Sequence, residues 1–145
     1  MKRLACTIGL LLLLATPLAQ AQKFPQRQVR IVVPFPAGSA PDQTARIVGQ
    51  ELQTLYGQTF VIDNKPGAQG AIGAVDAAKS PPDGHTLFLT TNTTQAANVS
   101  LFRKLPYDPK SDFEPILPLF KTYFFFAVPT TSKYKTVADL IADAR

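Results

Sequence analysis

Side chains able to carry out acid–base chemistry are few in this sequence and stand apart from one another. His85 is the only histidine, and it lies next to a glycine turn. Acid–base catalysis needs a group placed by hydrogen bonding within reach of its proton, so a structural role is favoured for His85. The candidate carboxylates stand mostly in turns, where aspartate is common. They are Asp63, Asp83, Asp108, Asp112 and Glu114.

Motifs of established catalytic chemistry do not occur in the sequence. It contains no G-x-S-x-G nucleophile elbow, no H-E-x-x-H and no spacing typical of metal ligands. We therefore predict that the protein is not an enzyme and that it uses no metal and no cofactor.

A loop at residues 34–41, PFPAGSAP, follows an apolar stretch and leads into a helical pattern. The first N–H groups of a helix and its dipole attract anions. No lysine follows Gly38 as a phosphate-binding P-loop requires, and the glycines at 67, 70 and 73 are not spaced like a dinucleotide fingerprint. The loop thus indicates an anion site without either nucleotide motif. The alternative is a capping box, in which Ser39 and Asp42 only begin the helix.

A second polar loop spans residues 91–98. Its neutral donors and acceptors suit a polar small molecule that is held reversibly. They are Thr91, Asn92, Thr93, Thr94 and Gln95. The alternative is a polar turn that caps a short helix near residues 95–98.

Both loops follow predicted strands. Strands are expected at residues 29–33, 59–62 and 86–90, with a helix that Gly57 ends between the first two and a shorter helix at 72–79. This βαβαβ order predicts an α/β fold with a parallel sheet, whose ligands gather at the carboxyl ends of the strands. Both polar loops leave those ends.

The first 21 residues have the three parts of a secretory signal peptide: a basic start, an apolar run and an A-x-A site at 19–21. A membrane anchor is the rival interpretation, but the apolar run is interrupted and short for a spanning helix. We expect a mature chain that begins at Gln22, without Cys6, the only cysteine. It keeps 13 of the 15 basic residues against 10 acidic ones, a net charge of +3. This mild, scattered charge gives little support to nucleic-acid binding and suits anionic solutes.

Four motifs in order, VPFPAG, NKPGAQGAIG, PDGHTL and LPYDPKSDFEPI, resemble the periplasmic solute receptors of tripartite tricarboxylate transporters, the Bug family. The resemblance covers nearly all of the mature chain. It implies a periplasmic-binding-protein-like Venus-flytrap fold, with a parallel sheet flanked by helices. It also implies that the protein binds a small carboxylate in the periplasm and passes it to membrane permease subunits.

The same resemblance implies that two loops face the ligand, and that backbone amides and bridging waters hold its carboxylate. The corresponding residues are Phe35, Ala37, Gly38, Ser39, Asp42, Thr91, Asn92, Thr93 and Thr94.

The sequence departs from the family pattern in three respects. Ser39 stands where the family usually has a second glycine, and Val99 where a proline commonly follows Asn98. Family members also continue well past this length into a second lobe with its own ligand-facing loop. We expect a leader at 1–21, a first lobe at 22–122 and the start of a second lobe at 123–145, with the aromatic run at 123–126 partly exposed. The alternative function is a truncated remnant without a role in transport.

Overall fold

The computed structural model describes residues 23–121, 123 and 125–144, so the predicted leader lies outside the described residues. The chain divides into two compact units, the first ending at Glu114 and the second beginning at Pro115. The expected lobe boundary after residue 122 stays a prediction.

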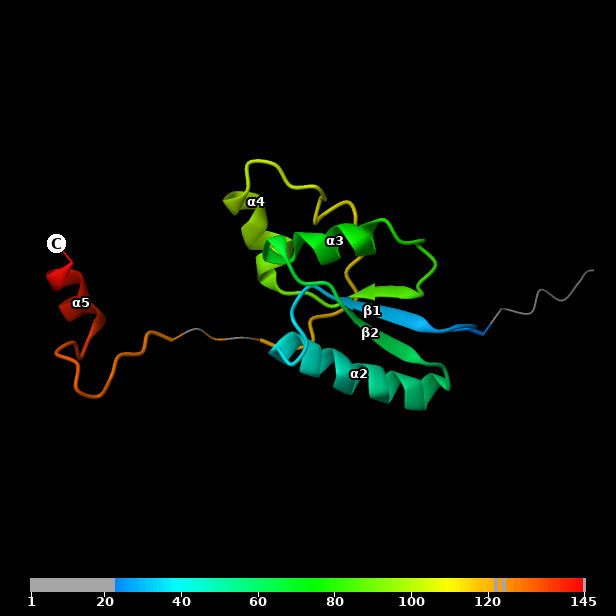
Figure 1. Cartoon of the computed structure of the whole chain (residues 1–145), viewed down its shortest axis with the longest axis horizontal. Helices are drawn as coiled ribbons and strands as arrows, with labels where there is room; N and C mark the ends of the chain where they lie inside the picture. Colours follow the sequence, from blue (N-terminus) through cyan, green and yellow to red (C-terminus); the bar gives the residue numbers. More distant parts are fainter. Residues whose placement is uncertain (1–22, 122, 124, 145) are drawn as a thin grey trace, which may run out of the picture. The chain divides into compact units, whose positions relative to one another are not determined.

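The first unit contains a three-stranded parallel sheet (Figure 1). Its strands are β1 (Val29–Val33), β2 (Phe60–Asn64) and β3 (Thr86–Phe88), in the order β2-β1-β3. Ile31 in the central strand lies opposite Ile62 of β2 and Leu87 of β3. The predicted α/β fold with a parallel sheet is confirmed. Only the strand ends differ, because β2 begins and ends later than expected and β3 is shorter.

The helices of the first unit are α2 (Ala40–Tyr56), the short 3-10 helix η1 (Ala68–Gly70), α3 (Ala71–Ala78), the π-helix η2 (Thr93–Ala97) and α4 (Asn98–Leu101). Two of them, α2 and α3, follow the predicted pattern, and the 3-10 and π turns beside them were not predicted. Gly57 ends α2 as predicted: its φ of 69° is left-handed, and its N–H donates to the carbonyl of Gln53.

The two faces of the sheet are covered by different helices, α2 on one and α3 on the other (Figure 1). Ile31 and Val33 pack with Ala45 of α2 and Leu89. The opposite face carries a cluster of Ala71, Ala74 and Tyr107, with Phe88 and Phe113 against it. Alternate residues of β1 point to opposite faces, and β1 contacts both α2 and α3.

Arg30 is the charged exception in this central strand. Its guanidinium contacts the carboxylates of Asp63 at 3.0 Å and Asp76 at 2.6 Å, and donates to the Ser80 hydroxyl at 2.9 Å. Lys65 lies 3.3 Å from Asp76. Burial raises the pKa of Asp76, but the hydrogen bonds from Arg30 and Lys65 outweigh it and lower that pKa overall. The two aspartates thus neutralise the Arg30 guanidinium, which would otherwise be unpaired on the α3 face of the sheet.

Two glycines let η1 and α3 approach the end of β1. A Cβ on Gly73 would lie 2.9 Å from Pro34 Cβ and 3.1 Å from the backbone oxygen of Lys65. Gly70 has a φ of 87°, and a Cβ there would lie 2.9 Å from Thr94 Oγ1. Gly70 and Gly73, whose spacing does not match a nucleotide motif, are therefore explained by the close packing of η1 and α3 against the end of β1.

The second unit, described over residues 115–121, 123 and 125–144, contains one helix, α5 (Val137–Asp143). Thr136 and Asp139 form a capping box at its start. Tyr123, Phe125 and Phe126 are 74%, 87% and 89% exposed, which confirms that the aromatic run is partly exposed. The position of Phe124 lies outside the described residues.

Among the residues that the structure describes, no helix combines the length and the apolar character needed to cross a membrane.

Gly73 and Gly49 offer a matched test of this packing, since both lie inside helices. Alanine at Gly73 meets backbone atoms, whereas at Gly49 it meets mainly the tip of Ile62 at 3.3 Å. We expect Gly73→Ala to lower the free energy of unfolding by about 1–3 kcal/mol through overpacking. Gly49→Ala should change it by less than about 1 kcal/mol, because better helix propensity offsets the tight contact. Urea denaturation of the full chain measures both, and equal stability of the two variants would contradict the close approach.

Candidate functional site

The loops that follow the three strands meet at the carboxyl edge of the sheet. Gly70, after β2, lies between the other two loops, because a Cβ there would be 3.3 Å from Pro34 Cβ and 2.9 Å from Thr94 Oγ1. Elements η1 and η2 also pack together. The structure thus brings the two polar loops singled out by sequence to one place.

Asp42, in the first turn of α2, ties the first loop to its surroundings. Only 1% of this residue is exposed. One carboxylate oxygen accepts from the Gly38 N–H at 2.8 Å and from Arg46 Nε at 3.0 Å. The other accepts from Asn64 Nδ2 at 3.0 Å, and the same amide nitrogen donates to the carbonyl of Phe35 at 3.1 Å. The carboxylate therefore joins the loop after β1, helix α2 and the end of β2.

These donors also determine how Asp42 titrates. Hydrogen bonds from Arg46, from the Gly38 N–H and from Asn64 lower the pKa of Asp42 from 3.8 to about 2, against the opposing effect of burial. Asp42 is thus ionised at every pH at which the protein would work.

The predicted capping box between Ser39 and Asp42 is wrong in its details. Ser39 occupies the N-cap position with extended backbone angles, but its side chain makes no capping hydrogen bond. Pro41 removes one of the two N–H groups that a cap accepts from. Asp42 bonds the N–H of Gly38, one residue before the position that a capping box uses.

Several polar atoms in the two loops are shielded from solvent and make no hydrogen bond with the described residues. They are Ser39 Oγ in the first loop, Thr90 Oγ1 directly before the second, and Thr94 Oγ1, Gln95 Oε1 and Asn98 Oδ1 within it; His85 Nε2, at the opposite end of β3, is in the same state. Shielded oxygens of this kind normally have a partner. Their gathering at and beside the two loops makes this edge the candidate binding site of the first unit.

The nine predicted site residues differ in how far they are accessible. Ala37, Gly38 and Asn92 are exposed, and Asp42 and Thr94 are buried. The others are partly buried: Phe35, Ser39, Thr91 and Thr93. Gly38 has a φ of 84°, with open space where a Cβ would stand.

Sequence reasoning missed two residues that shape this site, Arg46 and Asn64. The signals were present, because Arg46 lies four residues after Asp42 on the same helix face and Asn64 ends the second strand. What the pattern did not reveal was that both point at one carboxylate.

His85 lies at the start of β3, at the other end of the strand from the polar loop. Its Nδ1 is 3.1 Å from the carbonyl of Asp83, and its ring packs edge-on against Phe24. Asp63 is paired with Arg30, Asp83 with Arg27, and Asp108 and Asp112 close a local turn. Within the described part of the chain, no group of three His, Cys, Asp or Glu residues is placed to hold a metal ion.

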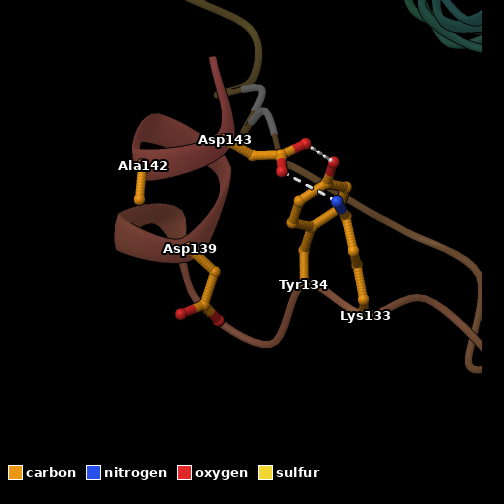
Figure 2. Close-up of a pocket in the computed structure, with 5 residues that line it drawn as sticks. All are labelled: Lys133, Tyr134, Asp139, Ala142 and Asp143. Atoms are coloured by element: carbon orange, nitrogen blue, oxygen red, sulfur yellow. Dashed lines mark hydrogen bonds and ion pairs between the residues drawn. The ribbon is translucent and has the colours of Figure 1, made fainter. Parts of the chain in front are cut away.

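A shallow hollow in the second unit is lined by Lys133, Tyr134, Asp139, Ala142 and Asp143 (Figure 2). Asp143 accepts from the hydroxyl of Tyr134 and lies 2.8 Å from Lys133 Nζ. Asp139 accepts the N–H groups of Lys135 and Thr136. Because the two carboxylates are already used in this way, the hollow is a poor candidate for a binding site.

Comparison with known proteins agrees with the motifs. Residues 44–145 match the tripartite tricarboxylate transporter family receptor, TctC. A UPF0065 protein of Bordetella bronchiseptica is 38% identical over 135 residues, which are 93% of this chain and 40% of that protein.

Two solved structures are similar in fold and sequence. Rpa4515 of R. palustris, solved with adipate, is 40% identical with a TM-score of 0.73, over 83% of this chain and 40% of that one. MatC of Rhodopseudomonas palustris, with bound malate, is 43% identical with a TM-score of 0.61, over 63% of this chain and 31% of that one.

This chain spans 33% to 41% of the length of the curated relatives it matches. The matched family is one of transporter receptors, and one similar solved structure is that of the periplasmic binding protein BugD, which confirms the prediction that the protein is not an enzyme. The chain belongs to the family of tripartite tricarboxylate transporter receptors.

Proposed function

We propose that this chain supplies one wall of a periplasmic receptor for a small dicarboxylate or tricarboxylate, and that the wall is the carboxyl edge of its sheet. The observation that carries the proposal is the meeting of the two polar loops there, with shielded oxygens that lack partners. Malate and adipate, bound by two similar structures, are both small dicarboxylates.

The proposed contacts divide between two kinds of residue. The exposed backbone at Ala37 and Gly38 and the amino end of α2 face the ligand carboxylate, with the N–H groups that Asp42 and the Pro36 carbonyl leave free as donors, together with Phe35 and Ser39. The second loop contributes Thr91, Asn92 and Thr93 as neutral donors, with the buried Thr94 directly behind them. Neutral groups orient an anion without holding it permanently, as release to a transporter requires.

Asp42 has a positioning role in this proposal. Its oxygens are turned toward Gly38, Arg46 and Asn64. A carboxylate aimed at an anionic ligand would repel it, whereas here Arg46 balances the charge. Because Asp42 occupies the Gly38 N–H, the loop offers its remaining backbone donors in one fixed arrangement.

The proposal extends to location and partners. The leader at 1–21 directs the chain to the periplasm, and the solute passes to the membrane permease subunits of a tripartite tricarboxylate transporter.

We expect the chain by itself to bind malate or adipate only at millimolar concentration or more weakly. A solvated helix end contributes about 0.3–1 kcal/mol and each neutral hydrogen bond about 0.5–1.5 kcal/mol, set against the cost of immobilising the ligand. A chimera that adds the remaining residues of the B. bronchiseptica relative should bind orders of magnitude more tightly, because its cleft can close. Calorimetry of both proteins measures this. No binding by the chimera would favour the remnant, and micromolar binding by the chain alone would mean that the site is misplaced.

Gly38→Val should abolish diacid binding by the chimera, because its side chain would fill the open space in front of the loop. Gly57→Val is the matched control, since Gly57 also has a left-handed φ and open surroundings but lies at the far end of α2. Both variants should lose similar stability from backbone strain. Equal affinities of the two variants for adipate in calorimetry would remove Gly38 from the site.

Asp42 should stabilise the fold in a pH-dependent manner. Because its pKa falls from 3.8 to about 2 on folding, its contribution is complete above about pH 5 and is lost as the pH falls from about 4 to 2. The difference in melting temperature between wild type and Asp42→Asn should therefore shrink across that range. A difference that stays constant down to pH 2 would show that the charge of Asp42 does not hold the loop.

A further inference from the structure

Tyr107 belongs to the motif LPYDPKSDFEPI, which the proposed ligand contacts do not explain. It lies between α4 and the turn at Asp108, and only 7% of it is exposed. Its ring packs against Ala71 and Ala74 and meets the Phe113 ring edge-on, with ring centres 6.2 Å apart. A phenylalanine ring could make the same packing contacts. The role of the hydroxyl must therefore come from its hydrogen bonds.

The hydroxyl of Tyr107 joins three neighbouring elements. It donates to the backbone carbonyl of Thr94 in η2 at 2.6 Å. It also accepts from Asn98 Nδ2 at 3.2 Å, and the same nitrogen donates to the carbonyl of Gln69 in η1 at 3.0 Å. Asn98 and Thr94 are fully buried. Removing the hydroxyl would therefore leave a buried acceptor and a buried donor each short of one partner.

The hydroxyl of Tyr107 contacts the carbonyl that the π-turn of η2 leaves without its α-helical partner. In an α-helix the N–H of Asn98 would donate to the carbonyl of Thr94, four residues earlier. Here it donates to the carbonyl of Thr93, five residues earlier. The Thr94 carbonyl accepts from Tyr107 instead. One wide turn thus accommodates an additional residue within the second loop, starting at the proposed contact residue Thr93, and π-turns of this kind are frequent at functional sites.

We propose that Tyr107 is a positioning residue for the ligand: its hydroxyl holds the π-turn, and the π-turn sets where residues 91–94 stand at the carboxyl edge. This role rests on the proposed carboxylate site. In this proposal, the YDP part of the motif affects ligand binding indirectly, through the position of residues 91–94. The turn closed by Asp108 and Asp112, whose backbone N–H and carboxylate are 2.7 Å apart, anchors the chain next to Tyr107.

The test compares Tyr107→Phe with Tyr56→Phe, which changes an exposed tyrosine on α2. Both are made in the full chain and labelled with ¹⁵N, and adipate and malate are titrated at constant ionic strength. In Tyr107→Phe we expect amide shifts and faster hydrogen exchange confined to residues 91–98. The loss of one hydrogen bond should weaken diacid binding by about three- to tenfold. Tyr56→Phe should match wild type in both measurements.

The outcomes separate the two proposals. If neither the wild-type chain nor the chimera shows diacid-induced shifts, the proposed function fails, and the role of Tyr107 fails with it. If wild type binds and Tyr107→Phe binds equally well, only the role of Tyr107 is overturned. Should Tyr107→Phe not fold, deletion of the exposed Ala96 removes the additional residue of the π-turn with Tyr107 in place. That deletion should weaken binding to a similar extent, and unchanged affinity would overturn the proposal.

Discussion

The buried carboxylate of Asp42 is the interaction on which the carboxyl edge of the sheet depends. It accepts hydrogen bonds from a loop, from its own helix and from the neighbouring strand. A buried charge is tolerated only when such donors surround it. Any movement of the Gly38 loop away from α2 would leave Asp42 short of partners. The loop is therefore kept in one conformation by the cost of leaving that charge unsatisfied.

The small residues near this edge work together with the charged network. Gly70 and Gly73 allow η1 and α3 to lie directly against Pro34 and Thr94, so the loops after all three strands share one surface. On the same side of the sheet, Arg30, Asp63 and Asp76 hold β1, β2 and α3 in fixed relation. The close glycine contacts and the ion pairs thus fix the same elements, and the polar loops are attached to elements that are held in place.

Much of the first unit followed from sequence pattern, because each element there depends on local rules. Val29–Val33 is a continuous apolar-rich strand, and Gly57 ends α2 as its position predicted. The hydrogen bond from Asn64 to Asp42 joins residues 22 positions apart, and that from Tyr107 to Thr94 joins residues 13 apart. Such contacts depend on strand register and helix packing, which residue spacing alone does not encode. The capping box failed for a more local reason, because Pro41 lacks an N–H and Asp42 accepts from the Gly38 N–H instead.

The neutral character of the second loop bears on how a receptor of this kind would treat its ligands. Malate and adipate differ in length, yet each ends in carboxylates. A wall that offers a helix end and hydroxyl groups recognises one carboxylate and places little constraint on what lies beyond it. In the proposed function, these loops therefore bind the carboxylate that different solutes share. Groups outside these loops distinguish the length and the substituents of the solute. In the proposed site, Tyr107 and Asp42 act in parallel, because Asp42 is hydrogen-bonded to the first loop and Tyr107 to the second.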